Sequence, residues 1–205
     1  MTALLEFNNV AIDKDNAISF SVSSGEMLVL KVSSEEAKMS VIDMALGEMV
    51  PANGKILLLG QLLVEYKPGS IGLIPASGGM ISNLKAWENI TLPLWYHGKR
   101  QTITTEESIA HWLNELNMDK QEWEKFMASP TARLKPLERK LVGLLRGLVH
   151  APRLLLIDAG LFDDVESSQL RDWIKVLEQF VREVDGRAVL VVTSAATSLP
   201  WRIIE

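Results

Sequence analysis

Runs of apolar residues alternate with amphipathic segments along most of the chain. The two most apolar runs, 154–157 and 188–192, contain only Leu, Ile, Val and Ala, which predicts strands that are buried on both faces. Between them, residues 167–183 place apolar side chains at the helical period. Residues 18–22 alternate apolar and polar side chains, which predicts a half-exposed strand at an antiparallel edge. Apolar strands that alternate with helices predict an α/β fold on a mainly parallel sheet.

Residues 76–133 interrupt this alternation with three segments of helical spacing, the first of which we expect to end near Pro93. The sequence therefore predicts a helical subdomain, 76–133, that is inserted into an α/β core. The core is expected to consist of residues 1–75 and 134–205, with the antiparallel edge at its N-terminal end.

Composition and charge exclude several classes of protein. The chain has 205 residues and a formal net charge of −5, which suits one domain with a small subdomain and argues against a nucleic-acid partner. It has no cysteine and three histidines, so we expect no disulfide and no metal site. It begins without a signal-peptide pattern, and no stretch approaches the roughly 20 apolar residues of a membrane span. These features predict a cytoplasmic protein.

The most informative stretch is 28–47, which reads as a strand, a tight connection and a helix. In an α/β chain this arrangement is where phosphate-binding loops lie, because a helix N-terminus offers free N–H groups to an anion. Lys38 is the one residue in the connection that has the usual chemistry of such a loop. The functional question therefore depends on what surrounds Lys38.

With its motifs taken in order, the chain resembles the ATP-binding subunits of ABC transporters over nearly its whole length. The resemblance implies a P-loop NTPase-like fold, and its 82–94 stretch is most similar to importer and lipid-transport subunits. It rests on Gly25-Glu26, Lys38, Pro51 to Gly60, Ile71 to Ile74, Ser82 to Leu94, Arg146 to Pro152 and Leu154 to Asp158.

The phosphate loop departs from the family pattern G-x-x-x-x-G-K-[ST]. Ser40 has a hydroxyl, but it lies one residue beyond the magnesium-binding position, which turns it by about 100° around the helix. Glu35 and Glu36 would each repel a phosphate by up to about 4 kcal/mol at 4 Å. Aligned on Lys38, the glycine positions are Val32, Glu35 and Ala37, and the magnesium-binding hydroxyl position is Met39.

The same residues fit a helix cap. Ser33-x-x-Glu36 is a capping-box pattern, in which the serine and the glutamate satisfy each other's backbone N–H groups and contribute about 1 kcal/mol. We favour this interpretation over phosphate binding, with Lys38 paired to Glu35, Glu36 or Asp158. Asp158, at a strand end, is then expected to be structural.

The remaining catalytic positions of the resemblance are altered together. Pro136 removes an N–H donor from the signature, and Ala159 cannot activate water. We therefore predict no ATP hydrolysis, no strong ATP binding and no cofactor; ATP with magnesium is expected only if Lys38, Ser40 and Asp158 retain residual binding. The family's glutamine is Ala76, its signature reads Leu134-Lys135-Pro136-Leu137-Glu138, its catalytic glutamate is Ala159 and its histidine is Ser194.

The helical segment keeps the family pattern better. In the family this region docks a short helix of the membrane permease, and exposed apolar residues are what such docking needs. The alternative is that these side chains form the core of the subdomain. The predicted docking residues are Met80, Ile81, Leu84, Trp87, Pro93 and Trp95.

Three functions follow from the resemblance. The first is a non-catalytic scaffold that is docked on a permease at the cytoplasmic face of the inner membrane, alone or as a homodimer or pseudo-symmetric dimer. The second is a soluble adaptor or regulatory protein that uses the same fold to bind another protein. The third is a weak ATP-binding or ATPase subunit of a transporter. Because both halves of the family's shared site are altered, an inert partner in an asymmetric ATPase is not expected.

Overall fold

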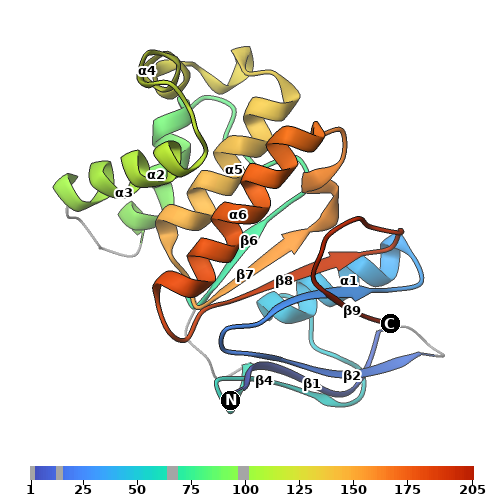
Figure 1. Ribbon diagram of the computed structural model, residues 1–205. Helices are drawn as coiled ribbons and strands as arrows, with labels where there is room; N and C mark the ends of the chain where they lie inside the picture. The colour runs from blue at the N-terminus through green and yellow to red at the C-terminus, as the bar shows by residue number, and fades with distance from the viewer. Residues whose placement is uncertain (1–2, 13–15, 64–68, 97–101) are drawn as a thin grey trace. The chain divides into compact units, whose positions relative to one another are not determined.

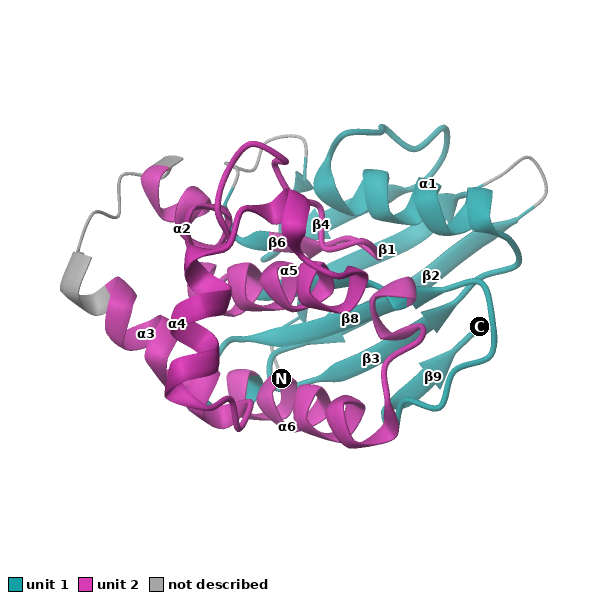
Figure 2. Cartoon of the chain, turned by 90° about the horizontal axis from the view of Figure 1, so that it is seen from above, with its two compact units in different colours: residues 1–71, 153–159, 181–205 teal, residues 72–152, 160–180 magenta. Residues whose placement is uncertain are grey.

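The computed structural model describes residues 3–12, 16–63, 69–96 and 102–205, which fall into two compact units (Figure 2). Unit 1 comprises residues 1–71, 153–159 and 181–205. Unit 2 comprises residues 72–152 and 160–180. The candidate phosphate loop belongs to unit 1, and the predicted docking residues belong to unit 2.

An antiparallel sheet forms one layer of unit 1, with the strand order β2-β1-β4-β5. The predicted half-exposed strand is confirmed, because Ile18, Phe20 and Val22 are each more buried than the serines between them. Phe20 stacks on Phe7 of the neighbouring strand, with ring centroids 4.7 Å apart. The strands are β1 (Ala3–Ala11), β2 (Ala17–Ser23), β4 (Lys55–Leu58) and β5 (Gln61–Leu62).

A parallel sheet forms the other layer of unit 1, in which β7, β8, β3 and β9 are successive neighbours. Strands β7 and β8 are labelled in Figure 1, and β8, β3 and β9 in Figure 2. The two predicted apolar strands are confirmed: every residue of β7 and of β8 is buried. Helix α1 (Glu35–Leu46) contacts β8. The strands are β3 (Met27–Lys31), β7 (Leu154–Asp158), β8 (Ala188–Thr193) and β9 (Arg202–Ile204).

Unit 2 is mainly helical. Helices α2 and α3 both pack against α5, and the ring of Trp112 on α3 lies 6.4 Å from that of Phe180 on α6. The first predicted helix begins later and ends later than expected, since α2 continues past Pro93. The helices are α2 (Ala86–Tyr96), α3 (Thr102–Glu115), α4 (Lys120–Ala128), α5 (Pro136–His150) and α6 (Ser167–Glu183), of which α6 ends in unit 1.

The short elements complete the description. Strand β6 (Ile71–Ile74) starts at the boundary of the two units, and 3-10 turns cover Thr131–Arg133 and Ala159–Phe162. The predicted subdomain, 76–133, lies wholly in unit 2, together with residues 134–152 and 160–180 that the sequence assigned to the core. The division into a core and an inserted subdomain stays a prediction. None of the helices in the described part of the chain is long and apolar enough to cross a membrane.

Candidate functional site

The N-terminus of α1 is capped by Ser34. Its backbone is extended, and its Oγ accepts a hydrogen bond from the N–H of Ala37 at 3.1 Å. The predicted capping box with Ser33 as the cap is therefore wrong by one residue. The helix starts one position later, so that its third residue is Ala37, which has no carboxylate to bond back to the cap.

Two carboxylates lie in the first turn of α1, where the partial positive charge of the helix N-terminus favours them. The hydrogen bond from Lys38, and then the one from the Ser194 hydroxyl, hold the pKa of Glu35 below its ordinary value. The Glu36 backbone N–H, and then the Ser34 hydroxyl, likewise lower the pKa of Glu36. Both glutamates therefore have local partners that favour their ionised forms.

Lys38 is buried, with 7% of its surface exposed, and it is held by two carboxylates. Its Nζ lies 2.7 Å from Oε2 of Glu35 and 2.9 Å from Oδ1 of Asp158, the last residue of β7. Burial alone would lower the pKa of Lys38, but the hydrogen bonds to Glu35 and Asp158 outweigh it and raise the pKa. The hypothesis that Lys38 pairs locally is confirmed for Glu35 and Asp158. We call Glu35, Lys38, Asp158 and Ser194 the Lys38 cluster.

Two N–H groups near this cluster have partners within unit 1. Val32 donates its N–H to the carbonyl of Thr193 at 2.8 Å, and Ala37 donates to Ser34. The side chains of Val32 and Ala37 are buried, at positions where the family has glycines. Met39 is 48% exposed and offers a thioether, and Ser40 follows it on the helix. The loop thus carries apolar and acidic side chains at the positions where the family has glycines.

The predicted signature positions begin α5. Pro136 is the first helical residue, and the backbone N–H of Lys135 donates to Oε2 of Glu138 at 2.6 Å. A carboxylate of the chain therefore occupies this helix N-terminus, as it does in α1. Ala76 is half-buried in the segment after β6, and Ala159 follows Asp158 and opens a 3-10 turn. No group of three His, Cys, Asp or Glu side chains among the described residues is placed to hold a metal ion.

The predicted docking residues are partly exposed. Trp95, Ile81 and Trp87 expose 57%, 44% and 39% of their surface, and Met80, Leu84 and Pro93 are half-buried. The alternative, that the helical segment is simply core, describes other residues, among them Ile90 and Leu113, which are fully buried. An exposed group of large apolar side chains therefore lies on α2 and the segment before it.

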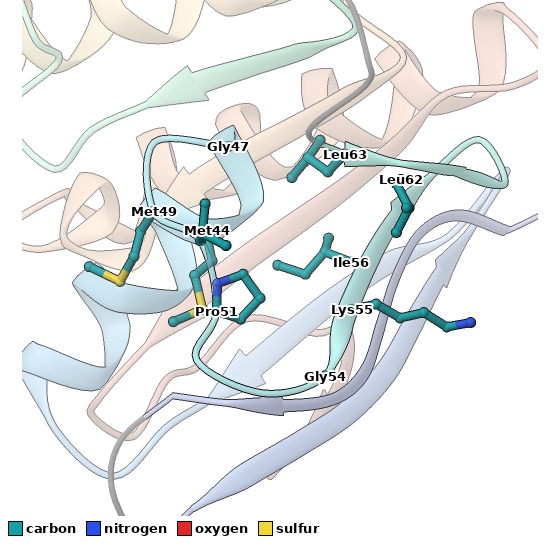
Figure 3. Close-up of a pocket in the computed structure, with 10 residues that line it drawn as sticks. Met44, Gly47, Met49, Pro51, Gly54, Lys55, Ile56, Leu62 and Leu63 are labelled. Carbon is teal, nitrogen blue, oxygen red and sulfur yellow. The ribbon is translucent and has the colours of Figure 1, made fainter.

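Unit 1 also has a pocket of about 180 Å³ that no sequence pattern predicts (Figure 3). It is lined mainly by apolar side chains, among them Met44, Pro51, Ile56 and Leu63. It adjoins Gly47 at the C-terminal end of α1. Along α1, Gly47 lies about 14 Å from Lys38, so the pocket does not belong to the candidate phosphate site.

A lysine in the first turn of a helix that follows a buried parallel strand, with an aspartate at the end of another strand, defines a P-loop type of nucleotide-binding fold. The chain belongs to the ABC transporter family, whose sequence model matches residues 16–160. Over 177 residues it is 26% identical to the ergothioneine transport ATP-binding protein EgtV of Helicobacter pylori (strain G27). The matched stretch covers 84% of this chain and 80% of that protein.

Solved structures share the fold. One from Pyrococcus furiosus, described as an ABC transporter ATP-binding protein, superposes with a TM-score of 0.78 at 13% identity, covering 98% of this chain and 96% of that one. A dimeric ATP-binding cassette in a post-hydrolysis state, bound to ADP and Pi, gives a TM-score of 0.74 at 17% identity, covering 93% and 88%. The predicted P-loop NTPase-like α/β fold, with parallel and antiparallel sheets, is confirmed.

Replacing Lys38 with Met should lower the free energy of unfolding by roughly 3 kcal/mol, because Asp158 is 8% exposed and would lose its cationic partner. The double variant Lys38→Met/Asp158→Asn should recover at least half of that loss. Urea denaturation at pH 7 measures both. A Lys38→Met protein as stable as the wild type would show that the buried pair does not stabilise the fold.

The contribution of Glu35 should depend on pH. Because the folded-state pKa of Glu35 is lowered from 4.5, its stabilisation is complete above that value and is lost as the pH falls through the lowered folded-state pKa. Lys38 has a raised pKa, so its share is lost only above about pH 10.5. Glu35→Gln should thus be less stable than wild type at pH 7 and equal to it in strong acid, whereas exposed Glu124→Gln serves as the control. A difference that persists unchanged into strong acid would contradict the assignment.

Proposed function

We propose that this chain is a non-hydrolysing subunit of an ABC transport complex, which acts as a scaffold docked on a membrane permease. The observation that carries the proposal is that the Lys38 ammonium already forms ion pairs with Glu35 and Asp158. A nucleotide phosphate at this position would have to compete with both carboxylates for one cation. Each carboxylate–phosphate repulsion would cost up to about 4 kcal/mol at 4 Å.

The other positions support the loss of hydrolysis. Ala159 has no side-chain group that accepts a proton from water, and Met39 has no oxygen ligand for magnesium. At the N-terminus of α5, the N–H of Lys135 already donates to the Glu138 carboxylate, so it is not free to bind a γ-phosphate. Pro136 has no N–H to donate. We accordingly expect no bound ATP or magnesium in the working protein.

The exposed apolar side chains on and before α2 support the docking part of the proposal. Trp and Ile side chains bury large areas when they pack on a partner helix, which is why exposed ones mark interaction surfaces. A permease segment is the occupant we infer, because the chain belongs to a transporter family. The scaffold would then lie at the cytoplasmic face of the membrane, alone or as a homodimer or pseudo-symmetric dimer.

One observation favours a second candidate, a weak ATP-binding or ATPase subunit of an ABC transporter. The Helicobacter relative is named as an ATP-binding protein of ergothioneine transport. That name gives ergothioneine, not a lipid, as what the relative transports, so it does not support the lipid-transport likeness of the 82–94 stretch. In this candidate Lys38, Ser40 and Asp158 would hold nucleotide after the ion pairs of the Lys38 cluster had opened.

Nucleotide assays separate the two candidates. Purified protein with magnesium and ATP should release no phosphate above a blank, and calorimetry should detect no binding at micromolar ATP. Turnover near 1 per second, which is ordinary for enzymes, would overturn the proposal, as would a micromolar Kd. Lys38→Ala is the matched control, because any binding that survives this change does not use the loop.

Affinity purification from detergent-solubilised native membranes tests docking. The tagged full-length chain should retain a polytopic membrane protein, and Trp95→Glu should lose it, since a charge on this 57%-exposed side chain opposes burial. Val50→Glu, at a 72%-exposed site in unit 1, should behave like the wild type. Retention of only soluble proteins would favour the adaptor function instead.

A further inference from the structure

The segment between β6 and α2, residues 75–85, is held by side chains from distant parts of unit 2. It contains no regular helix or strand, and one of its residues is the exposed Ile81. Four polar residues of the described part of the chain bond to its backbone: Glu88 and Asn89 on α2, Thr131 in the 3-10 turn and Arg146 on α5. None of these was among the predicted site residues, because sequence alone does not tell a buried polar side chain from an exposed one.

Arg146 fixes the start of the segment. Its Nη2 and Nη1 donate to the carbonyls of Gly78 at 2.7 Å and Gly79 at 2.5 Å. The backbone also lies directly on α5, because a Cβ at Gly78 would come within 2.2 Å of the Arg139 carbonyl oxygen. A Cβ at Gly143 would likewise come within 2.5 Å of Gly78 Cα. Neither glycine can carry a side chain without a shift of backbone.

Asn89 bonds to both backbone groups of Ile81. It is fully buried, its Oδ1 accepts from the Ile81 N–H at 2.8 Å, and its Nδ2 donates to the Ile81 carbonyl at 3.1 Å. The same Nδ2 donates to the carbonyl of Lys85, also at 3.1 Å. One side chain thus satisfies both backbone groups of Ile81 and ties them to the first turn of α2.

Thr131 also bonds to the backbone of this segment. It is 3% exposed, and its Oγ1 lies within hydrogen-bond distance of the carbonyls of Ser82, at 2.9 Å, and Ile81, at 3.2 Å. Its N–H donates to the carbonyl of Leu84 at 3.2 Å. The backbone from Ile81 to Leu84 is therefore bonded to Asn89 and Thr131 while the Ile81 side chain stays 44% exposed.

We propose that Asn89 and Thr131 are positioning residues of the docking surface, which fix the Ile81–Leu84 turn in its binding conformation before the partner arrives. Arg146 anchors the preceding backbone. A turn that is already ordered loses less conformational entropy when a partner covers it, so affinity rises without a new contact. The identity of the partner as a permease segment rests on the proposed function, whereas the fixing of the turn does not.

Thr131→Val is the decisive variant. Valine has nearly the same shape, keeps the backbone N–H to Leu84 and removes only the hydroxyl. Thr131→Ser keeps the hydroxyl and should behave like the wild type. Thr197→Val, in unit 1, removes a hydroxyl far along the chain and is the matched control. Asn89→Leu is the stronger change, to be used if it leaves the melting temperature within a few degrees of the wild type.

Two readouts test the proposal. Hydrogen exchange of peptides covering 78–88 should speed up about tenfold in Thr131→Val, with wild-type rates in Thr131→Ser and Thr197→Val. Sedimentation with urea-washed inner-membrane vesicles from the producing organism should weaken about tenfold in Thr131→Val alone. A Thr131→Val protein with wild-type exchange would overturn the fixing of the turn.

Faster exchange with unchanged vesicle binding would overturn the link to docking. Wild-type protein that does not bind the vesicles at all would overturn the proposed docking function, and the docking role of the two residues with it. The exchange rates would still decide whether Asn89 and Thr131 fix the turn, so the two failures are distinguishable.

Discussion

The ion pairs of Lys38 are the constraint on which the functional interpretation of this chain depends. A lysine with 7% of its surface exposed needs partners, because an unpaired buried charge is costly. In this chain the partners are Asp158, from β7, and Glu35, from the same helix turn. They join α1 to the parallel sheet within unit 1, so that a residue type associated with phosphate binding serves a structural role.

The same solution recurs at a second helix. Glu138 accepts the N–H of Lys135 at the start of α5, and the two glutamates of α1 lie in its first turn. Helix N-termini attract anions, and a carboxylate of the chain supplies the negative charge without any bound ligand. An acidic first turn also stabilises the helix that carries it. Carboxylates of the chain therefore lie at the N-terminal ends of both helices.

The sequence predicted the buried strands and the α/β class because those signals are local: β7 and β8 are apolar at nearly every position. It placed the α1 cap on Ser33 instead of Ser34, because two adjacent serines offer the same hydroxyl and only the backbone decides which one caps. It ended a helix near Pro93, whereas packing on α5 carries α2 through the proline. The bonds of Thr131 join segments about 50 residues apart in sequence, which no local pattern encodes.

The close approach of Gly78 to α5 has a consequence for how this chain can vary. At the phosphate-loop positions the chain already carries the larger side chains of Val32, Glu35 and Met39. Gly78 and Gly143 meet backbone to backbone, where even a methyl group finds no room. Gly78 and Gly143, like Gly54 against the Asn9 carbonyl, are therefore positions where any side chain would meet backbone atoms, and Gly78 lies in the same segment as Ile81.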